Sequence, residues 1–285
     1  MDNVMGVIIS IAILALALAS GMLQGITGYQ IRTQTTITGC TEISSPGEYV
    51  LANDIVDSSS STCINITSSN VVFDAAGHLI DGDNSNSAYA IYLNYGNLEN
   101  ITIKSANITD WTTYSVYVNA SSNVSINNIS STQKMLIENS NHVSIDKAHI
   151  HGAEYAIYAG PYCSYINVTN STFFNIYSSS DAVTFYYTDY VNFINNTVHS
   201  NNFGVGLSSS NNNIIAHNFI YDNIYGLSFS SVSNTLVYDN FFNNTNDAFS
   251  SGNYLNTTLQ NGTNIIGGNL IGGNFWAKPD GTGFS

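Results

Sequence analysis

The stretch Tyr190–Ala248 decides the fold, because within it the chain repeats itself. VNFINNTVHSNNFGVGL at 191–207 is followed by IIAHNFIYDNIYGLSF at 214–229 and by LVYDNFFNN at 236–244. Each copy holds a short apolar strand, an Asn, a second apolar residue and, in two copies, a second Asn and a Gly-containing strand. The first strands end at 193, 216 and 238, so the spacings are 216−193=23 and 238−216=22 residues. A unit this short cannot bury an apolar face alone, so similar units must stack, and strands without intervening helices predict a parallel β-helix.

The same register extends towards the N-terminus. The first strand recurs at 71–73, 101–103, 124–126, 143–145 and 166–168, and the second recurs at 90–93, 115–118, 135–137, 156–158 and 182–185. Side chains alternate between the two faces of a strand, so one set faces inward. Ile215 and Leu236 are expected to face inward, and the repeated Asn side chains are expected to hydrogen-bond turn backbones from coil to coil.

Three phrases carry a family resemblance: SSNVVFDAAGHLIDG at 68–82, the repeated Asn-Asn-x-Ile…Tyr-Gly-Leu, and GGNFWAKPDGTGFS at the end of the chain. They resemble the right-handed β-helix family of carbohydrate-binding and sugar-hydrolase-type repeats, which includes NosD-like proteins. The likeness to versions on archaeal cell surfaces covers roughly 40–285. The motif is specific for the fold and weak for the activity.

The predicted fold class is all-β: a single-stranded right-handed parallel β-helix preceded by one N-terminal hydrophobic α-helix. Residues 1–28 are the hydrophobic helix, 29–39 a linker, 40–63 a disulfide-closed cap and 64–250 the coils. Residues 251–285 form the last coil and C-terminal cap, in which Trp276 closes the open core.

Composition restricts the partners and the compartment. Lys and Arg number 5 against 19 Asp and Glu, which gives a net charge of −14 and makes nucleic-acid binding unfavourable. Dense Asn-x-Ser/Thr sequons favour a glycosylated, exported protein. The sequon asparagines are Asn65, Asn100, Asn107, Asn119, Asn123, Asn128, Asn167, Asn170, Asn195, Asn243, Asn256 and Asn261.

Cysteine usage agrees with export. Cys40 and Cys63 bracket a segment with turn signals, and a disulfide between them would add roughly 3 kcal/mol in the chain-entropy model. The alternative is two unpaired buried thiols. Cys163 has no evident partner, and the three cysteines do not have metal-site spacing.

The segment Val4–Leu23 has no charged residue, Pro or Asn and is long enough to span a bilayer as a helix. It lacks the basic flank of a cleaved secretory signal, although Ala17–Ser20 resembles a cleavage site. It also resembles the N-terminal helix of processed pilin or archaellin-type subunits, whose apolar helices pack in a filament core. The residues expected to drive such assembly are Val4, Ile8, Ile9, Ile11, Leu14, Leu16, Leu18 and Leu23.

Two groups of polar residues were considered as reactive or metal sites. Asp74, Asp81 and Asp83 flank His78, but Asp and Gly at such positions more often form turns. The copper association of the resembled family directs attention to histidine, yet no carboxylate or cysteine stands at aligned positions of neighbouring coils. The histidines concerned are His142, His149, His151, His199 and His217.

Many tyrosines could form a sugar-stacking face, although tyrosine also suits half-buried strands and stabilises ladders, and the structural interpretation is favoured. These tyrosines are Tyr92, Tyr95, Tyr117, Tyr155, Tyr158, Tyr162, Tyr165, Tyr186, Tyr187 and Tyr190.

The sequence therefore predicts a non-enzymatic extracellular structural protein without a cofactor, a glycosylated pilin-like filament subunit with an outward β-helix. Its partners would be copies of itself, the membrane before assembly, and surface glycans. The first alternative is a membrane-anchored adhesin that binds glycans, and the second is a carbohydrate-active lyase or hydrolase.

Overall fold

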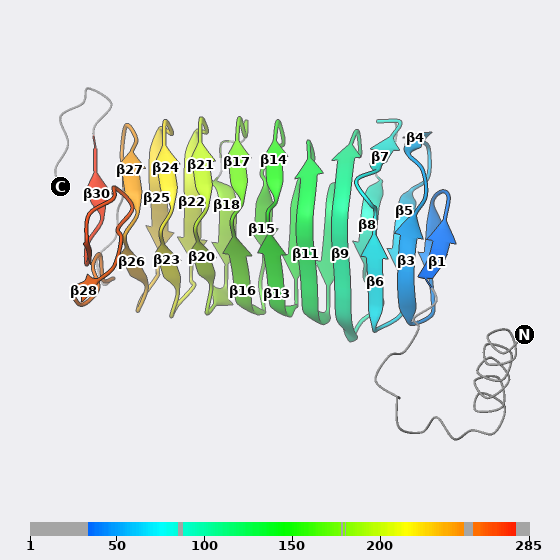
Figure 1. Ribbon diagram of the computed structural model, residues 1–285, viewed down its shortest axis with the longest axis horizontal. Coiled ribbons are helices and arrows are strands. Elements are labelled where there is room, and N and C mark those ends of the chain that lie inside the picture. The colour runs from blue at the N-terminus through cyan, green and yellow to red at the C-terminus, as the bar shows by residue number, and fades with distance from the viewer. Residues whose placement is uncertain (1–33, 85–87, 178, 180, 248–252, 278–285) are drawn as a thin grey trace, which may run out of the picture. The chain divides into compact units, whose positions relative to one another are not determined.

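The computed structural model describes residues 34–84, 88–177, 179, 181–247 and 253–277, which form a parallel β-solenoid (Figure 1). Its strands make a 19-stranded sheet, a nine-stranded sheet and a two-stranded hairpin. Within these described ranges no residue is helical. The predicted all-β parallel solenoid is therefore confirmed for this part of the chain.

Each coil contributes strands to three faces. The first face of the 19-stranded sheet holds β1 (Gln34–Ile37), β3 (Gly47–Leu51), β6 (Val71–Asp74), β9 (Leu98–Thr109), β11 (Ser121–Ser131), β13 (Asn141–Asp146), β16 (Cys163–Thr169), β19 (Thr188–Asp189), β20 (Asn192–Ile194), β23 (Ile214–Ala216) and β26 (Leu236–Tyr238). The second face holds β4 (Ile55–Ser58), β7 (Leu79–Gly82), β14 (His149–His151), β17 (Thr172–Phe174), β21 (Thr197–His199), β24 (Phe219–Tyr221), β27 (Phe241–Asn243) and β30 (Phe275–Trp276). The long strands β9 and β11 pair on both faces and join them into one sheet.

The third face is the nine-stranded sheet, with one strand from each of nine coils. It holds β2 (Thr41–Ile43), β5 (Thr62–Ile66), β8 (Tyr89–Leu93), β10 (Tyr114–Asn119), β12 (Met135–Glu138), β15 (Ile157–Ala159), β18 (Asp181–Tyr186), β22 (Phe203–Ser208) and β25 (Tyr225–Ser230). The remaining pair, β28 (Gln260–Asn261) and β29 (Leu270–Ile271), is antiparallel.

The core follows from the alternation of side chains. Phe193 pairs with Ile215, and Ile215 pairs with Val237, so equivalent residues in these coils are 22 positions apart (215−193 and 237−215). All three side chains are fully buried. The same inward register holds at Val71 and Phe73 and through the first-face strands that follow.

The prediction for Leu236 was wrong. Leu236 pairs with the half-buried Ile214 on the outer side, and the inward residue of β26 is Val237. The strands Ile214–Ala216 and Leu236–Tyr238 are apolar throughout, so alternation does not mark their register. The predicted register aligned the last residues of the strands and was therefore shifted by one residue between these coils. A shift of one residue in a strand moves every side chain to the opposite face.

Asparagine ladders line the turns, as the sequence predicted. Asn218 Oδ1 accepts the backbone N–H of Asn196 at 2.8 Å, and Asn240 Oδ1 accepts that of Asn218 at 2.9 Å. Asn274 Oδ1 continues the ladder by accepting the N–H of Asn240 at 3.1 Å. A second ladder contains Asn201, Asn223 and Asn244. Because these turns are buried, the amides satisfy backbone groups that water cannot reach.

The turns also place many residues in the left-handed region. Positive φ angles recur immediately before the inward residue that begins the next straight segment, and most of these residues are Asn, Asp or Ser. Asn and Asp tolerate this conformation better than other residues with a Cβ. The high asparagine content is therefore a requirement of the turns as well as of the ladders.

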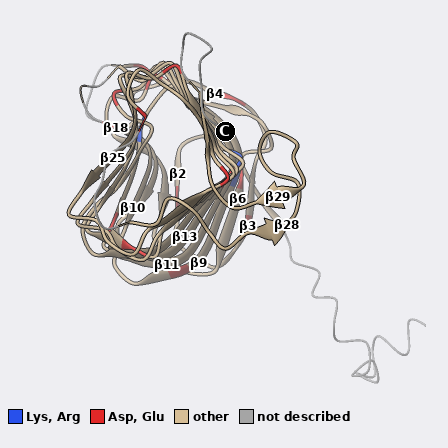
Figure 2. Ribbon diagram, turned by 90° about the vertical axis from the view of Figure 1, so that its left-hand side faces the viewer, with Lys and Arg blue, Asp and Glu red and all other residues tan. Residues whose placement is uncertain are grey.

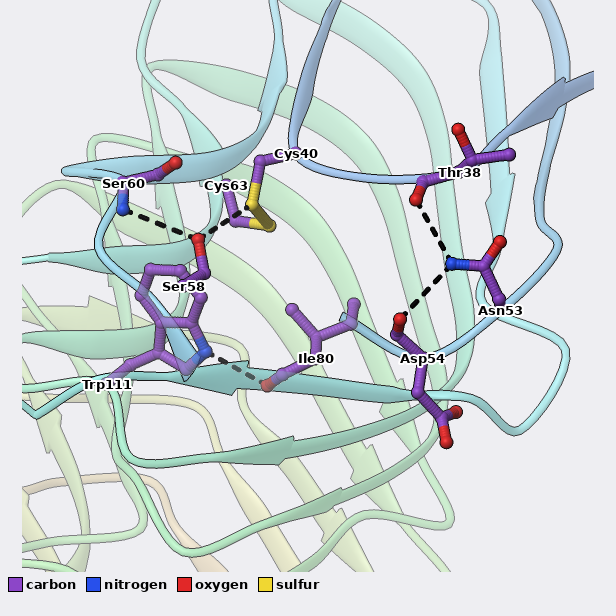
Figure 3. Close-up of a disulfide and its surroundings, with 9 residues drawn as sticks. All are labelled: Thr38, Cys40, Asn53, Asp54, Ser58, Ser60, Cys63, Ile80 and Trp111. Atoms are coloured by element: carbon purple, nitrogen blue, oxygen red, sulfur yellow. Dashed lines mark hydrogen bonds between the residues drawn. A yellow bond between two sulfur atoms is a disulfide. The ribbon is translucent and has the colours of Figure 1, made fainter. Parts of the chain in front are cut away.

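The predicted N-terminal cap is itself part of the solenoid. β1, which lies within the predicted linker 29–39, pairs in parallel with β3, and β2 pairs in parallel with β5 of the next coil. Cys40 and Cys63 are joined by a disulfide with their Cα atoms 4.2 Å apart (Figure 3). In the same region the Trp111 indole N–H donates to the carbonyl of Ile80 at 2.9 Å (Figure 3).

At the other end, Trp276 stacks on Phe242 with ring centroids 4.5 Å apart and packs against the core. The predicted hydrophobic helix 1–28 and its assembly residues lie outside the described residues, so the filament and membrane-anchor predictions stay predictions. A search of the described residues for a helix able to cross a membrane finds none.

Candidate functional site

The third face carries a repeated tyrosine pattern. Tyr-Ala-Ile-Tyr at 89–92, Tyr-Ser-Val-Tyr at 114–117 and Tyr-Ala-Ile-Tyr at 155–158 place two small or apolar residues between two tyrosines. The central residues are buried, and both tyrosines of each pattern are half-buried on the outer side. We call this set the tyrosine face: Tyr89, Tyr92, Tyr114, Tyr117, Tyr155 and Tyr158.

Four of these rings form one cluster. The ring centroids of Tyr89 and Tyr92 are 4.7 Å apart, and those of Tyr92 and Tyr117 are 5.3 Å apart. Tyr114 and Tyr117 are nearly parallel at 5.8 Å. Parallel pairing sets this arrangement, because Tyr114 lies beside Tyr89 and Tyr117 beside Tyr92. The result is an aromatic surface that spans two coils.

The next coil interrupts the tyrosines. Leu136 occupies the column between Tyr117 and Tyr158, since it pairs with both. Leu136 is only 8% exposed although it points outward, because the surrounding side chains cover it. A covered apolar residue therefore separates the four-ring cluster from Tyr158.

Polar groups border this aromatic surface. The Tyr117 hydroxyl donates to Glu138 Oε2 at 3.0 Å. An amide column runs beside it, in which Asn119 Nδ2 donates to Asn94 Oδ1 at 2.6 Å and Asn139 Nδ2 donates to Asn119 Oδ1 at 2.8 Å. Aromatic surfaces with a few fixed polar groups are typical of small-ligand sites, since the rings supply contact area and the polar groups supply orientation.

Gly160 leaves room for the side chains of Tyr158 and Glu138. A Cβ added at Gly160 would lie 2.8 Å from Tyr158 Cε1 and 3.4 Å from Glu138 Cγ. The absence of a side chain thus lets the Tyr158 ring and the Glu138 side chain approach each other.

Positive charge on the face is neutralised locally. Lys134 Nζ lies 5.5 Å from the Tyr114 ring centroid and 5.1 Å from that of Tyr155, and it pairs with the Glu154 carboxylate. Lys104 pairs with Asp74 at 3.0 Å on another face. Acidic residues exceed basic ones along the ribbon as a whole (Figure 2). A polyanionic ligand would therefore meet net repulsion.

Burial changes the titration of several groups on this face. Burial, followed by the hydrogen bond to Glu138, raises the pKa of Tyr117, and burial also raises the pKa of Tyr155. Both hydroxyls are consequently protonated donors at neutral pH. Burial raises the pKa of Asp181 to about 6. Its carboxylate lies over Gly206, where an added Cβ would be 1.8 Å from Asp181 Oδ2.

The acidic residues that flank His78 in the sequence make separate structural contacts. They are Asp74, Asp81 and Asp83. Asp74 accepts the N–H of Ala76 at 2.8 Å in addition to its pair with Lys104, and Asp81 accepts the hydroxyl of Thr109. His78 Nδ1 lies 2.9 Å from Asp54. The backbone N–H of Asp83 donates to the carbonyl of Ser58. These contacts favour the turn interpretation.

The histidines form part of a second aromatic surface. On the second face, His151 stacks on Phe174 at 5.0 Å, Phe174 on His199 at 5.2 Å and His199 on Tyr221 at 5.0 Å. Burial lowers the pKa of His149 and of His199, so both are mostly neutral at pH 7. Elsewhere His142 stacks on Tyr165, and His217 pairs with Asp239 at 2.6 Å.

Cys163 belongs to a buried column of small polar residues. It lies beside Thr188, and its thiol donates to the carbonyl of Ile137 at 3.6 Å. Burial raises the pKa of the thiol to about 11. The side chain therefore has the environment of a structural cysteine rather than of a nucleophile.

The sequons differ in exposure. Four sequon asparagines are half-buried in strands, namely Asn65, Asn119, Asn167 and Asn243. The other eight are exposed: Asn100, Asn107, Asn123, Asn128, Asn170, Asn195, Asn256 and Asn261.

Four members of the tyrosine face were among the tyrosines expected from the sequence to form an aromatic surface, whereas Tyr89 and Tyr114 were not. The signal that identifies them is the repeated Tyr-x-x-Tyr spacing, since both tyrosines emerge on the same side when the two residues between them face inward. The exposed Tyr95 and Tyr162 were also among the expected tyrosines but lie outside the face.

A sequence profile described as periplasmic copper-binding protein (NosD) matches residues 66–281. The donors of this chain do not fit a copper centre: among the residues that the structure describes, no three His, Cys, Asp or Glu side chains are placed to hold a metal ion. On the second face, His149 and His151 are in ring contact at 5.7 Å, and Phe174 separates this pair from His199. No curated relative matches the chain.

Several solved structures are similar in shape. The Azotobacter vinelandii mannuronan C-5 epimerase AlgE6 A-module is 12% identical, with 78% of this chain and 87% of that chain covered and a TM-score of 0.45. The periplasmic alginate epimerase AlgG is 15% identical, with 74% and 57% covered and a TM-score of 0.43. The Streptococcus pneumoniae surface protein and adhesin PfbA is 13% identical, with 76% and 68% covered and a TM-score of 0.43. Since the matched profile extends over most of the 285 residues, the chain belongs to the periplasmic copper-binding protein (NosD) family.

Proposed function

We propose that the protein is a non-enzymatic β-helix protein of the cell envelope or cell surface that binds neutral glycans on its tyrosine face. The observation that carries the proposal is the outward cluster of Tyr89, Tyr92, Tyr114 and Tyr117 beside Glu138 and an amide column. Flat rings pack against the C–H faces of sugars, while carboxylate and amide groups pair with hydroxyls. The periplasmic character of the family supports such a location.

Charge favours a neutral ligand. The one lysine on this face is paired with Glu154, and Glu138 and Asp181 add negative charge. With a net charge of −14, the chain would repel an acidic polysaccharide at low ionic strength. Uncharged oligosaccharides would not meet this electrostatic repulsion.

The arrangement of carboxylates supports binding rather than hydrolysis. Asp181 begins β18 and Tyr186 ends it, and the registers of β12, β15 and β18 place Glu138 two coils away in the column of Tyr186. Asp181 is thus displaced by about 16 Å along the strand from the column of Glu138. Glycosidase carboxylate pairs are separated by roughly 5–9.5 Å, so these two do not form such a pair.

The test is binding of the full-length chain to an array of neutral and acidic oligosaccharides, followed by calorimetry on the best ligand. Tyr92→Thr and Tyr117→Thr each introduce a residue type that a later coil carries in this column, at Thr184. Each should reduce affinity by about tenfold or more with little change in Tm. Tyr254→Thr, at an exposed tyrosine of the last coil, is the control. Preference for acidic glycans, or unchanged affinity in both face variants, would refute the proposal.

A further inference from the structure

Two columns of left-handed residues connect the third face to the first face. One column precedes Ser140, Cys163, Thr188 and Ser210 and reads Asn139, Tyr162, Tyr187 and Ser209 in successive coils. The other reads Asn123, His142, Tyr165, Tyr190 and Asn212. In two adjacent coils, tyrosine thus stands at positions where the surrounding coils carry Asn, Ser or His. We call Tyr162, Tyr165, Tyr187 and Tyr190 the corner tyrosines.

These four positions are unfavourable for tyrosine. Their φ angles are +63°, +55°, +49° and +58°, a region that bulky side chains rarely adopt. The exposed fractions are 82% for Tyr162, 53% for Tyr187 and 44% for both Tyr165 and Tyr190, so burial does little to offset the strain. Strained residues that packing does not explain cluster at functional sites.

One of the corner tyrosines is in ring contact with the end of the tyrosine face. The Tyr158 and Tyr186 ring centroids are 6.4 Å apart, and Tyr186 meets Tyr187 edge to face at 4.6 Å. Beyond the turn, Tyr165 stacks on Tyr190 at 4.8 Å with an interplanar angle of 6°. Ring contacts therefore lead from the third face to Tyr187 at the turn, and Tyr165 and Tyr190 form a separate stacked pair at the start of the first face.

We propose that the corner tyrosines are additional subsites for an extended neutral oligosaccharide that leaves the tyrosine face at Tyr158 and crosses the turn. This inference rests on the proposed glycan-binding function. Tyr165 is stacked between His142 and Tyr190, whereas Tyr162 is 82% exposed and has most of its surface available to a sugar. Asp189, which lies between Tyr187 and Tyr190 in the chain, adds negative charge at the corner, so an uncharged ligand is favoured here too. A short ligand fills the face alone, whereas a longer one also contacts the corner.

The experiment compares the wild-type full-length chain with Tyr162→Asn/Tyr187→Ser and with Tyr165→Asn/Tyr190→Asn. Each substitution introduces a residue that the same left-handed column carries one or two coils away: Asn139, Ser209, Asn123 and Asn212. Calorimetry is performed with neutral homo-oligosaccharides from disaccharide to octasaccharide, using the gluco-, xylo- and manno-series. Asn234→Ala, in the same column but two coils past Tyr190, is the control.

Both variants should lose about tenfold or more in affinity for the octasaccharide while keeping wild-type affinity for the shortest bound ligand. Their Tm should stay equal or rise by a few degrees, because Asn and Ser tolerate the left-handed conformation. A marked fall in Tm would show that the tyrosines serve packing and would overturn the inference. Equal octasaccharide affinity would overturn the inference and leave the proposed function standing.

Two further outcomes distinguish oligosaccharide binding at the corner tyrosines from other roles of this surface. Sedimentation of the same samples would reveal an interface between copies of this chain, and loss of self-association without loss of octasaccharide binding would overturn the inference. Failure of the wild type to bind any oligosaccharide would refute the proposed function and this inference with it.

Discussion

Asn218→Ala tests whether the asparagine ladder holds the coils together. The Asn218 amide is fully buried: its Oδ1 accepts from Asn196 N, and its Nδ2 donates to Phe193 O and Asn240 Oδ1, each at 2.8 Å. Alanine leaves the Asn196 N–H and the Phe193 carbonyl buried without these partners. Each orphaned group costs about 1–3 kcal/mol, so we expect a loss of about 3–5 kcal/mol in the free energy of unfolding.

The assay is equilibrium unfolding in guanidinium chloride, together with hydrogen exchange at single-residue resolution. Exchange of the Asn196 amide should accelerate most, since its acceptor is removed. Asn192→Ala in the preceding coil, which also contains Asn196, is the control, because Asn192 lies half-buried on the outer side and donates to Asn167 Oδ1. It should cost about 1 kcal/mol or less. Equal losses in the two variants, or unchanged exchange at Asn196, would refute the ladder as a source of stability.

Asp181→Asn should remove a pH dependence of the free energy of unfolding. The pKa of Asp181 in the folded state is about 6, raised from 3.8 by burial. The stability that protonated Asp181 contributes is therefore present below pH 3.8 and is lost as the pH rises through 6. The variant should exceed the wild type by about 1–2 kcal/mol at pH 7 and match it at pH 4 in chemical unfolding, after allowing for partial solvent screening; equal stability at pH 7 would contradict this. Ile215→Asp should unfold its neighbouring coils whereas Leu236→Asp should be tolerated, because only Ile215 is inward; circular dichroism melts that rank them otherwise would refute the register. Cys163 should react with iodoacetamide only after unfolding, and labelling of the native protein would contradict its burial. Glycopeptide mass spectrometry should find sugar at exposed sequons and none at the half-buried ones; the reverse would count against export in a glycosylated form. The half-buried sequon asparagines are Asn65, Asn119, Asn167 and Asn243.

The fold was predictable wherever inward and outward residues alternate. Ile101–Ile103 and Val124–Ile126 alternate apolar inner and polar outer residues, and their pairing follows the predicted register. Ile214–Ala216 has no polar member, so sequence alone left its face ambiguous. The buried asparagines were also predictable, because an amide repeated at the coil period can pair with equivalent backbone groups in each turn.

The candidate site was only partly predictable. Residue type identified the tyrosines, but their grouping depends on coil lengths, which vary from one turn to the next. Val116 pairs with Met135, 19 residues later, whereas Ile157 pairs with Val183, 26 residues later. A fixed period therefore cannot show that Leu136 lies between Tyr117 and Tyr158. The left-handed conformation of the corner tyrosines was even harder to predict from the sequence, because tyrosine is not a residue type that favours positive φ angles.

The division between inner and outer columns explains how this solenoid can carry a binding surface at little cost to its fold. Buried residues such as Phe193 and Asn218 supply the apolar contacts and turn hydrogen bonds that join each coil to the next. Outer columns contribute less, so Thr184 and Tyr158 can occupy the same column in adjacent coils. Tyrosines at left-handed positions are the exception, because they add strain without burial. Asparagine and serine tolerate these left-handed positions with less strain and occupy several of them in other coils, whereas tyrosine occupies them in two coils that adjoin the tyrosine face.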